Sequence, residues 1–88
     1  MLKDEFMKKI KDENIMLDRL DVVIGETTNV PFSLGCYEED NIWKIYQVGE
    51  RQNFSIIKFG SEEEIFDEMY SLIKGKIKIM QRLEKMNN

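Results

Sequence analysis

The chain of 88 residues carries 17 acidic and 13 basic side chains, a formal net charge of −4, and 42% of its residues are hydrophobic. This length predicts a single domain over residues 1–88, because so short a chain buries only a modest core. The negative charge argues against a nucleic-acid partner, and no apolar run approaches the roughly 18 residues that a membrane-spanning helix needs. We therefore expect a soluble globular domain with neither nucleic acid nor membrane as a partner.

The first residues, MLKDEFMKKIKDE, predict a short amphipathic helix, since Leu2, Phe6 and Ile10 recur every four residues among charged ones. The segment has no uninterrupted apolar stretch, so we expect no signal peptide and a cytoplasmic location. The denser apolar cluster IMLDRLDVVI follows and leaves the end of this helix undefined. Residues 25–32, GETTNVPF, contain Gly, Asn and the single Pro, and predict a connecting loop.

Three strands are predicted next, over residues 33–38, 42–48 and 53–59. The sequence EEDN separates the first two strands, and GERQ separates the last two. Asp and Asn tolerate left-handed backbone angles, and Gly49 supplies a positive φ at no steric cost. Both connections are therefore expected to be antiparallel hairpins.

Side chains alternate across a strand, so Trp43 and Ile45 are expected on one face of the sheet. This face is expected to pack on the helices, which makes Trp43 a core residue. Strict alternation puts apolar residues on both faces of the third strand, with one group formed by Ser55, Ile57 and Phe59 and the other by Phe54, Ile56 and Lys58. Either both faces of the sheet are partly covered, or one face is a binding surface.

The last third of the chain predicts a long helix. Ser61 and Glu64 form a capping box, in which the Ser61 oxygen accepts from the Glu64 amide and the Glu64 carboxylate reaches back to the Ser61 amide. Gly75 weakens the helix interior, so we expect a kink there or a stop followed by a shorter helical piece, with a short strand over KGKIKIM as the lesser alternative. One apolar stripe is expected to pack on the core: Phe66, Met69, Ile73, Ile77, Met80 and Leu83.

In chain order the elements predict an α+β domain with an N-terminal helix, a three-stranded antiparallel meander and a long C-terminal helix packed on the sheet. The sequence holds no histidine, no GxGxxG or GxxxxGK[ST] motif, and a single cysteine, Cys36, expected to be buried and inert. We therefore expect no catalytic residues, no metal site and no cofactor, and a protein that is not an enzyme.

The run CYEEDNIWKIYQVGERQNFSIIKFGSEEEIFDEMYSLI resembles small immunity proteins of bacterial polymorphic toxin systems, in particular immunity family fifty-nine. The resemblance implies a cytoplasmic protein that binds and neutralises one cognate toxin domain, usually one secreted between competing bacteria. The resemblance rests on a cysteine and an aromatic residue before a charged turn, followed by a tryptophan and a tyrosine in the next strand. It continues with a Glu-Arg pair in the next turn, an aromatic residue at the end of the last strand and an acid-rich start of the helix. These places are held by Cys36, Tyr37, Trp43, Tyr46, Glu50, Arg51, Phe59, Ser61, Glu62, Glu63 and Glu64.

The same stretch provides the candidate partner-binding residues. Nuclease toxins are basic where they hold phosphates, so acidic turns suit such a partner, and Arg and Tyr are enriched at binding hot spots. The candidates are Glu38, Glu39, Asp40, Tyr46, Glu50 and Arg51. The alternative is a homodimeric structural or regulatory module without a toxin partner, in which the C-terminal helix pairs with its own copy.

Overall fold

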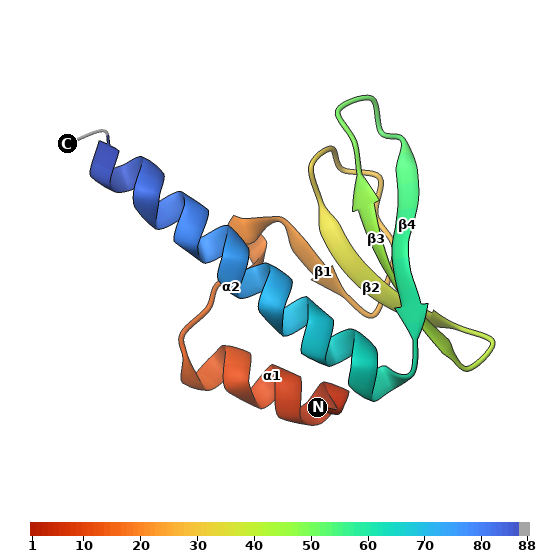
Figure 1. Cartoon of the computed structure of the whole chain (residues 1–88). Coiled ribbons are helices and arrows are strands. Elements are labelled where there is room, and N and C mark those ends of the chain that lie inside the picture. Colours follow the sequence, from red (N-terminus) through yellow and green to blue (C-terminus); the bar gives the residue numbers. More distant parts are fainter. Residues whose placement is uncertain (87–88) are drawn as a thin grey trace.

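A computed structural model of the chain describes residues 1–86, and the side chains up to residue 84. It has one helix near each end of the chain, α1 (Lys3–Asp12) and α2 (Glu62–Met86). The last two residues of the predicted domain lie outside this description. Both helices lie on one face of a sheet (Figure 1). Between the helices come a short 3-10 helix, η1 (Leu17–Leu20), and the strands β1 (Val22–Ile24), β2 (Leu34–Glu39), β3 (Ile42–Val48) and β4 (Phe54–Gly60).

The sheet has four strands in the order β1-β2-β3-β4, with β1 parallel to β2 and the other neighbours antiparallel. The α+β class and the β2–β4 meander are confirmed, and the prediction of only three strands is wrong. Val22, Val23 and Ile24 make a β-branched run too short to be distinguished from the end of a helix by its pattern. The pairing of β1 is also parallel, and no tight turn in the sequence predicts a parallel pair.

The core lies between the helices and the sheet. Phe66 of α2 contacts Phe6 of α1 with 5.0 Å between ring centroids, and it contacts Trp43 of β3 edge-on at 4.9 Å. Trp43 is only 7% exposed, which confirms its prediction as a core residue. Cys36 is fully buried among these side chains, as predicted, and burial raises the pKa of its thiol to about 11.

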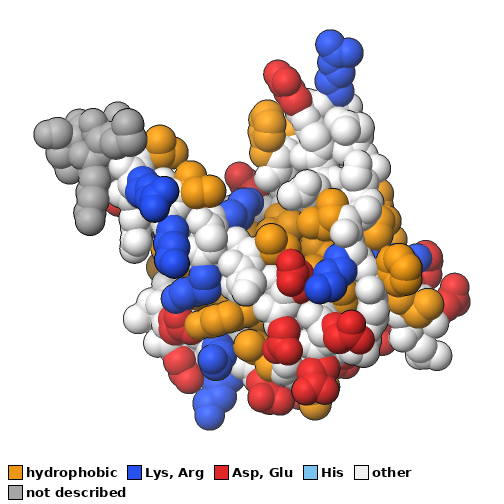
Figure 2. Space-filling model, in the orientation of Figure 1, with side chains coloured by type: hydrophobic (Ala, Val, Ile, Leu, Met, Phe, Trp, Pro, Cys, Tyr) orange, Lys and Arg blue, Asp and Glu red, His pale blue; other side chains and the backbone are white. Residues whose placement is uncertain are grey.

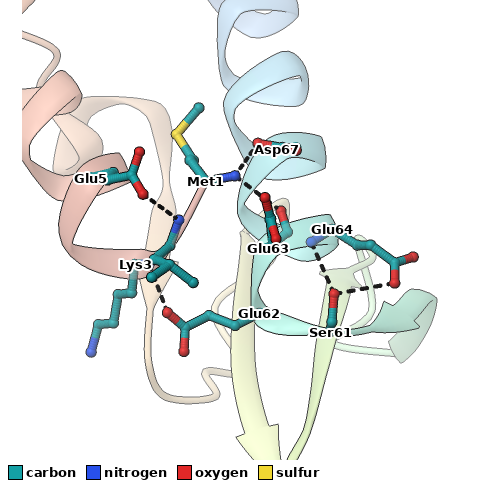
Figure 3. Close-up of polar contacts among 9 residues, drawn as sticks. Met1, Lys3, Glu5, Ser61, Glu62, Glu63, Glu64 and Asp67 are labelled. Atoms are coloured by element: carbon teal, nitrogen blue, oxygen red, sulfur yellow. Dashed lines mark hydrogen bonds and ion pairs between the residues drawn. The ribbon is translucent and has the colours of Figure 1, made fainter.

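The starts of the two helices are joined by polar contacts (Figure 3). The backbone N–H of Lys3 donates to Glu62 Oε2 at 2.9 Å, and the amino group of Met1 pairs with Asp67. The capping box is confirmed in its first half, since the Glu64 N–H donates to Ser61 Oγ at 3.2 Å. Its second half differs, because Glu64 Oε1 accepts from the Ser61 hydroxyl at 3.1 Å rather than from the Ser61 amide.

Helix α2 runs without interruption through Gly75, so the predicted stop and the alternative strand are both wrong. A glycine costs a helix interior only about 1 kcal/mol, which the packing of neighbouring turns outweighs. The predicted stripe is buried at Phe66, Met69 and Ile73 and becomes exposed at Met80 and Leu83. This happens because the second half of α2 extends beyond the sheet (Figure 1).

The two hairpin turns differ in the residues that take left-handed angles. Asp40 and Asn41 have φ of 54° and 65°, as predicted for a tight turn. Gly49 is not in the left-handed region, and Gln52 takes that conformation instead, with φ of 63°. The prediction for Gly49 was wrong because the turn is longer: the Gly49 N–H donates to the Asn53 carbonyl at 2.9 Å. A Cβ at Gly49 would lie 2.2 Å from the Asn53 side chain, so space explains this glycine.

Candidate functional site

In the described part of the chain, one face of the sheet carries no helix, and we call it the open face. Residues directly opposite each other on paired strands share a face of the sheet. The register therefore assigns to the open face Tyr37 of β2, Ile42, Lys44 and Tyr46 of β3, and Phe54, Ile56 and Phe59 of β4.

Tyr46 forms the buried centre of the open face. Its ring stacks on Phe54 with 4.8 Å between centroids, and its hydroxyl donates to the carbonyl of Glu26 at 2.8 Å. The loop from Gly25 to Ser33 thus covers Tyr46. Gly35 allows this packing, because a Cβ there would lie 2.4 Å from the Tyr46 ring. Burial raises the pKa of Tyr46 to about 12.

Tyr46 was predicted to contact a partner directly, whereas in this structure its side chain is fully buried. A hot-spot residue must offer surface to the partner, and Tyr46 offers none in this structure. Its role is to hold the loop onto the sheet.

A β-bulge in β4 changes which of its side chains reach the open face. Ile45 pairs with Lys58 and Tyr46 pairs with Ile56, so Ile57 has no partner in β3. The extra residue shifts the alternation by one position, which makes the predicted grouping of β4 side chains wrong beyond this point. Lys58 faces α2, where its Nζ lies 3.4 Å from Glu68 Oε2, and Phe59 joins the open face.

Four large apolar side chains of the open face are exposed to solvent: Ile42 at 42%, Phe54 at 45%, Ile56 at 42% and Phe59 at 69%. Apolar residues at both alternating positions of β4 left two alternatives open, namely that both faces are partly covered or that one face is a binding surface, and the structure leaves these four side chains exposed. Hydrophobic side chains are visible along the edge formed by β4 (Figure 2).

The predicted partner-binding residues lie at opposite ends of this apolar row. Glu38, Glu39 and Asp40 lie where β2 turns into β3, whereas Glu50 and Arg51 lie where β3 turns into β4. A strand of seven residues separates the two turns, which corresponds to roughly 20 Å. The candidates therefore do not form one cluster, and they bracket the apolar row as two charged ends.

The first of these ends is strongly acidic. Glu38 lies opposite Trp43, and Trp43 lies opposite Gly60, the residue before the acid-rich start of α2. Acidic side chains gather at this end of the molecule (Figure 2). Glu39 is partly neutralised, since it accepts from Lys44 Nζ at 2.8 Å and raises the pKa of that lysine.

The second end lies beside a cleft of about 360 Å³ between α2 and the β3–β4 hairpin. Figure 2 shows this hollow next to the second half of α2, which carries several basic side chains. Leu72 and Lys76 line the helix side of the cleft. Lys76 Nζ donates to the Leu20 carbonyl at 2.6 Å, and burial lowers its pKa. Glu50 and Arg51 are exposed at the hairpin tip.

Within residues 1–86, no group of three or more His, Cys, Asp and Glu side chains is arranged to hold a metal ion. The helices of this described part are also too short or too polar to cross a membrane. No family model, no curated protein and no solved structure matches the chain.

Proposed function

We propose that this protein acts by binding another protein through its open face, as an immunity protein does when it neutralises a cognate toxin domain. The observation that carries the proposal is the row formed by Ile42, Phe54, Ile56 and Phe59, exposed between two charged turns. An apolar centre with a polar rim is the usual anatomy of a protein interface, and exposed apolar patches mark interaction sites.

The resemblance of residues 36–73 to immunity proteins supports a toxin domain as the partner. The negative net charge of this chain supports a partner that is positively charged. The acidic turn at Glu38, Glu39 and Asp40 favours a basic partner, such as a nuclease toxin, because opposite charges at the rim of an interface speed encounter. Arg51 at the other turn is the candidate for a specific ion pair or hydrogen bond. Binding is stoichiometric and takes place in the cytoplasm of the producing cell.

The test is co-expression with the protein encoded immediately upstream in the source genome. We expect that protein to stop growth when expressed alone, growth to resume when this protein is co-expressed, and the two chains to copurify. Ile42→Lys should abolish rescue, because it puts a charge in the apolar row. The matched control is Ile79→Lys, at an exposed isoleucine of α2, which should rescue normally. Growth arrest in the presence of folded wild-type protein would refute the proposal.

The alternative function, a homodimeric structural or regulatory module without a toxin partner, is favoured by one observation. Ile79, Met80 and Leu83 are exposed on the part of α2 that extends beyond the sheet. This alternative predicts a homodimer that Leu83→Lys dissociates, together with no rescue in the co-expression assay.

A further inference from the structure

The outer edge of β4 has no neighbouring strand among the described residues, because β4 is the last strand of the sheet. Every side chain from Phe54 to Phe59 is exposed. The unpaired N–H and C=O groups of such an edge are a template for one more strand. The question is which strand fits.

The order of residue classes along β4 is the same from either end of the strand. From Phe54 to Phe59 the order is aromatic, polar, isoleucine, isoleucine, polar, aromatic. The bulge makes the faces match this order: Phe54 and Phe59 both lie on the open face, and Ser55 and Lys58 both lie on the helix face. In a strand without a bulge, positions five residues apart would point to opposite faces.

We infer that β4 pairs antiparallel with β4 of a second copy of this chain, across a two-fold axis between Ile56 and Ile57. An isologous contact needs a surface that is complementary to itself, which this palindromic order provides. The register aligns Phe54 with Phe59 of the second copy, Ser55 with its Lys58, and Ile56 with its Ile57. The result is one continuous sheet of two copies.

The charge on β4 is compatible with pairing to a second copy of the same strand. Lys58 is the single charged residue of β4, it meets Ser55 rather than another lysine in this register, and it already pairs with Glu68. The exposed second half of α2 is less suited to self-association. Residues 74–86 carry five basic side chains and one acidic side chain, so two copies of this segment have the same sign of net charge and repel each other.

The axis that relates two edge strands of one sheet is perpendicular to that sheet. The open faces of both copies therefore lie on the same side of the joined sheet and form one wider surface. The inference goes beyond the proposed function and does not depend on it, since dimerisation needs no partner protein. Strands of seven residues make a small contact compared with a standard interface of about 1,600 Å², so the dimer is reversible.

Sedimentation equilibrium over a range of concentrations tests the inference. We expect wild-type protein to shift from 10.5 kDa toward twice that mass as its concentration rises. Ile57→Lys places charges near the axis and should raise the dimer dissociation constant about tenfold or more. Two matched controls, Ile42→Lys on the open face and Leu83→Lys on α2, alter similarly exposed aliphatic residues and should leave that constant unchanged.

A second measurement fixes the register without relying on a destabilised strand. The double variant Ser55→Cys, Lys58→Cys should form a disulfide-linked dimer on mild oxidation, whereas Ser55→Cys alone should not, because its opposite residue is then a lysine. Circular dichroism confirms folding of each variant. A wild-type chain that stays monomeric at the highest concentration overturns the inference. So does a dimer that Leu83→Lys dissociates and Ile57→Lys does not, or equal cross-linking of the single and double variants.

Discussion

Tyr46 has a structural role in this fold rather than the partner contact that the sequence predicted. It was predicted to contact a partner, and the structure buries it under the loop that carries Glu26. Tyr46→Phe should therefore lower the free energy of unfolding by about 1 kcal/mol through the lost hydrogen bond. Tyr46→Ala should lower it by about 3–5 kcal/mol through the cavity. Urea unfolding followed by circular dichroism measures both values. A Tyr46→Ala variant with parental stability would show that the loop does not pack as described.

At the scale of elements, Gly75 is the clearest position for stabilising the protein. The helix continues through it, and apart from the backbone of its own helix and its chain neighbours, a Cβ there would meet no described atom within 4 Å. Gly75→Ala should raise the free energy of unfolding by about 1 kcal/mol, because alanine loses less backbone entropy in a helix. Thermal unfolding measures the gain. Gly35→Ala is the opposing control, which should destabilise because its Cβ would collide with Tyr46. A Gly75→Ala variant that melts earlier would contradict the unbroken helix.

The contacts of Glu13, which directly follows α1, with α2 should make the free energy of unfolding depend on pH. Glu13 accepts from Lys74 Nζ at 2.7 Å and from the Tyr70 hydroxyl, and these bonds hold the pKa of Glu13 below its usual value. A carboxyl with a lowered folded pKa stabilises the fold above its unfolded pKa, and this contribution is lost as pH falls through the folded pKa. Glu13→Gln should therefore be less stable than wild type at neutral pH, and the difference should shrink in acid. Urea unfolding at several pH values checks this, and a difference independent of pH would contradict it.

Elements with local signals were predictable, and those that depend on distant contacts were not. The turn at Asp40 and Asn41 and the start of α2 at Ser61 follow from two to four adjacent residues. The strand β1 needs its parallel partner β2, and its three residues carry almost no signal of their own. The bulge at Ile57 depends on how β4 meets β3, so strict alternation placed Phe59 on the wrong face.

The candidate site was predicted in part, for the same reason. The charged turn residues, such as Glu39 and Arg51, were assigned to turns correctly from the sequence alone. The two turns lie at opposite ends of β3, and this separation follows from the order of the strands. The turn residues therefore lie on either side of a surface and do not form one cluster. The burial of Tyr46 could not be predicted, because it depends on a loop that precedes β2 and crosses the open face.

At the scale of the whole molecule, charge is distributed along one direction. Acidic side chains gather where the helices begin and basic ones along the second half of α2 (Figure 2). If the acidic turn steers a basic partner, the double variant Glu39→Gln, Asp40→Asn should slow association several-fold at low salt and little at high salt. Asn keeps the left-handed backbone at position 40 favourable. Stopped-flow association rates check this against the control Glu84→Gln on α2, and equal rates for both variants would remove the steering role.

The dissociation rate of the complex with the neutralised toxin domain tests the role of the open face most directly. Phe59 is 69% exposed, so Phe59→Ala should leave the unfolding free energy nearly unchanged. An aromatic anchor at an interface is worth about 2 kcal/mol or more, so we predict dissociation about 30-fold faster for Phe59→Ala and unchanged dissociation for Leu83→Ala on α2. A Phe59→Ala complex that dissociates at the wild-type rate, or a larger effect of Leu83→Ala, would contradict binding through the open face.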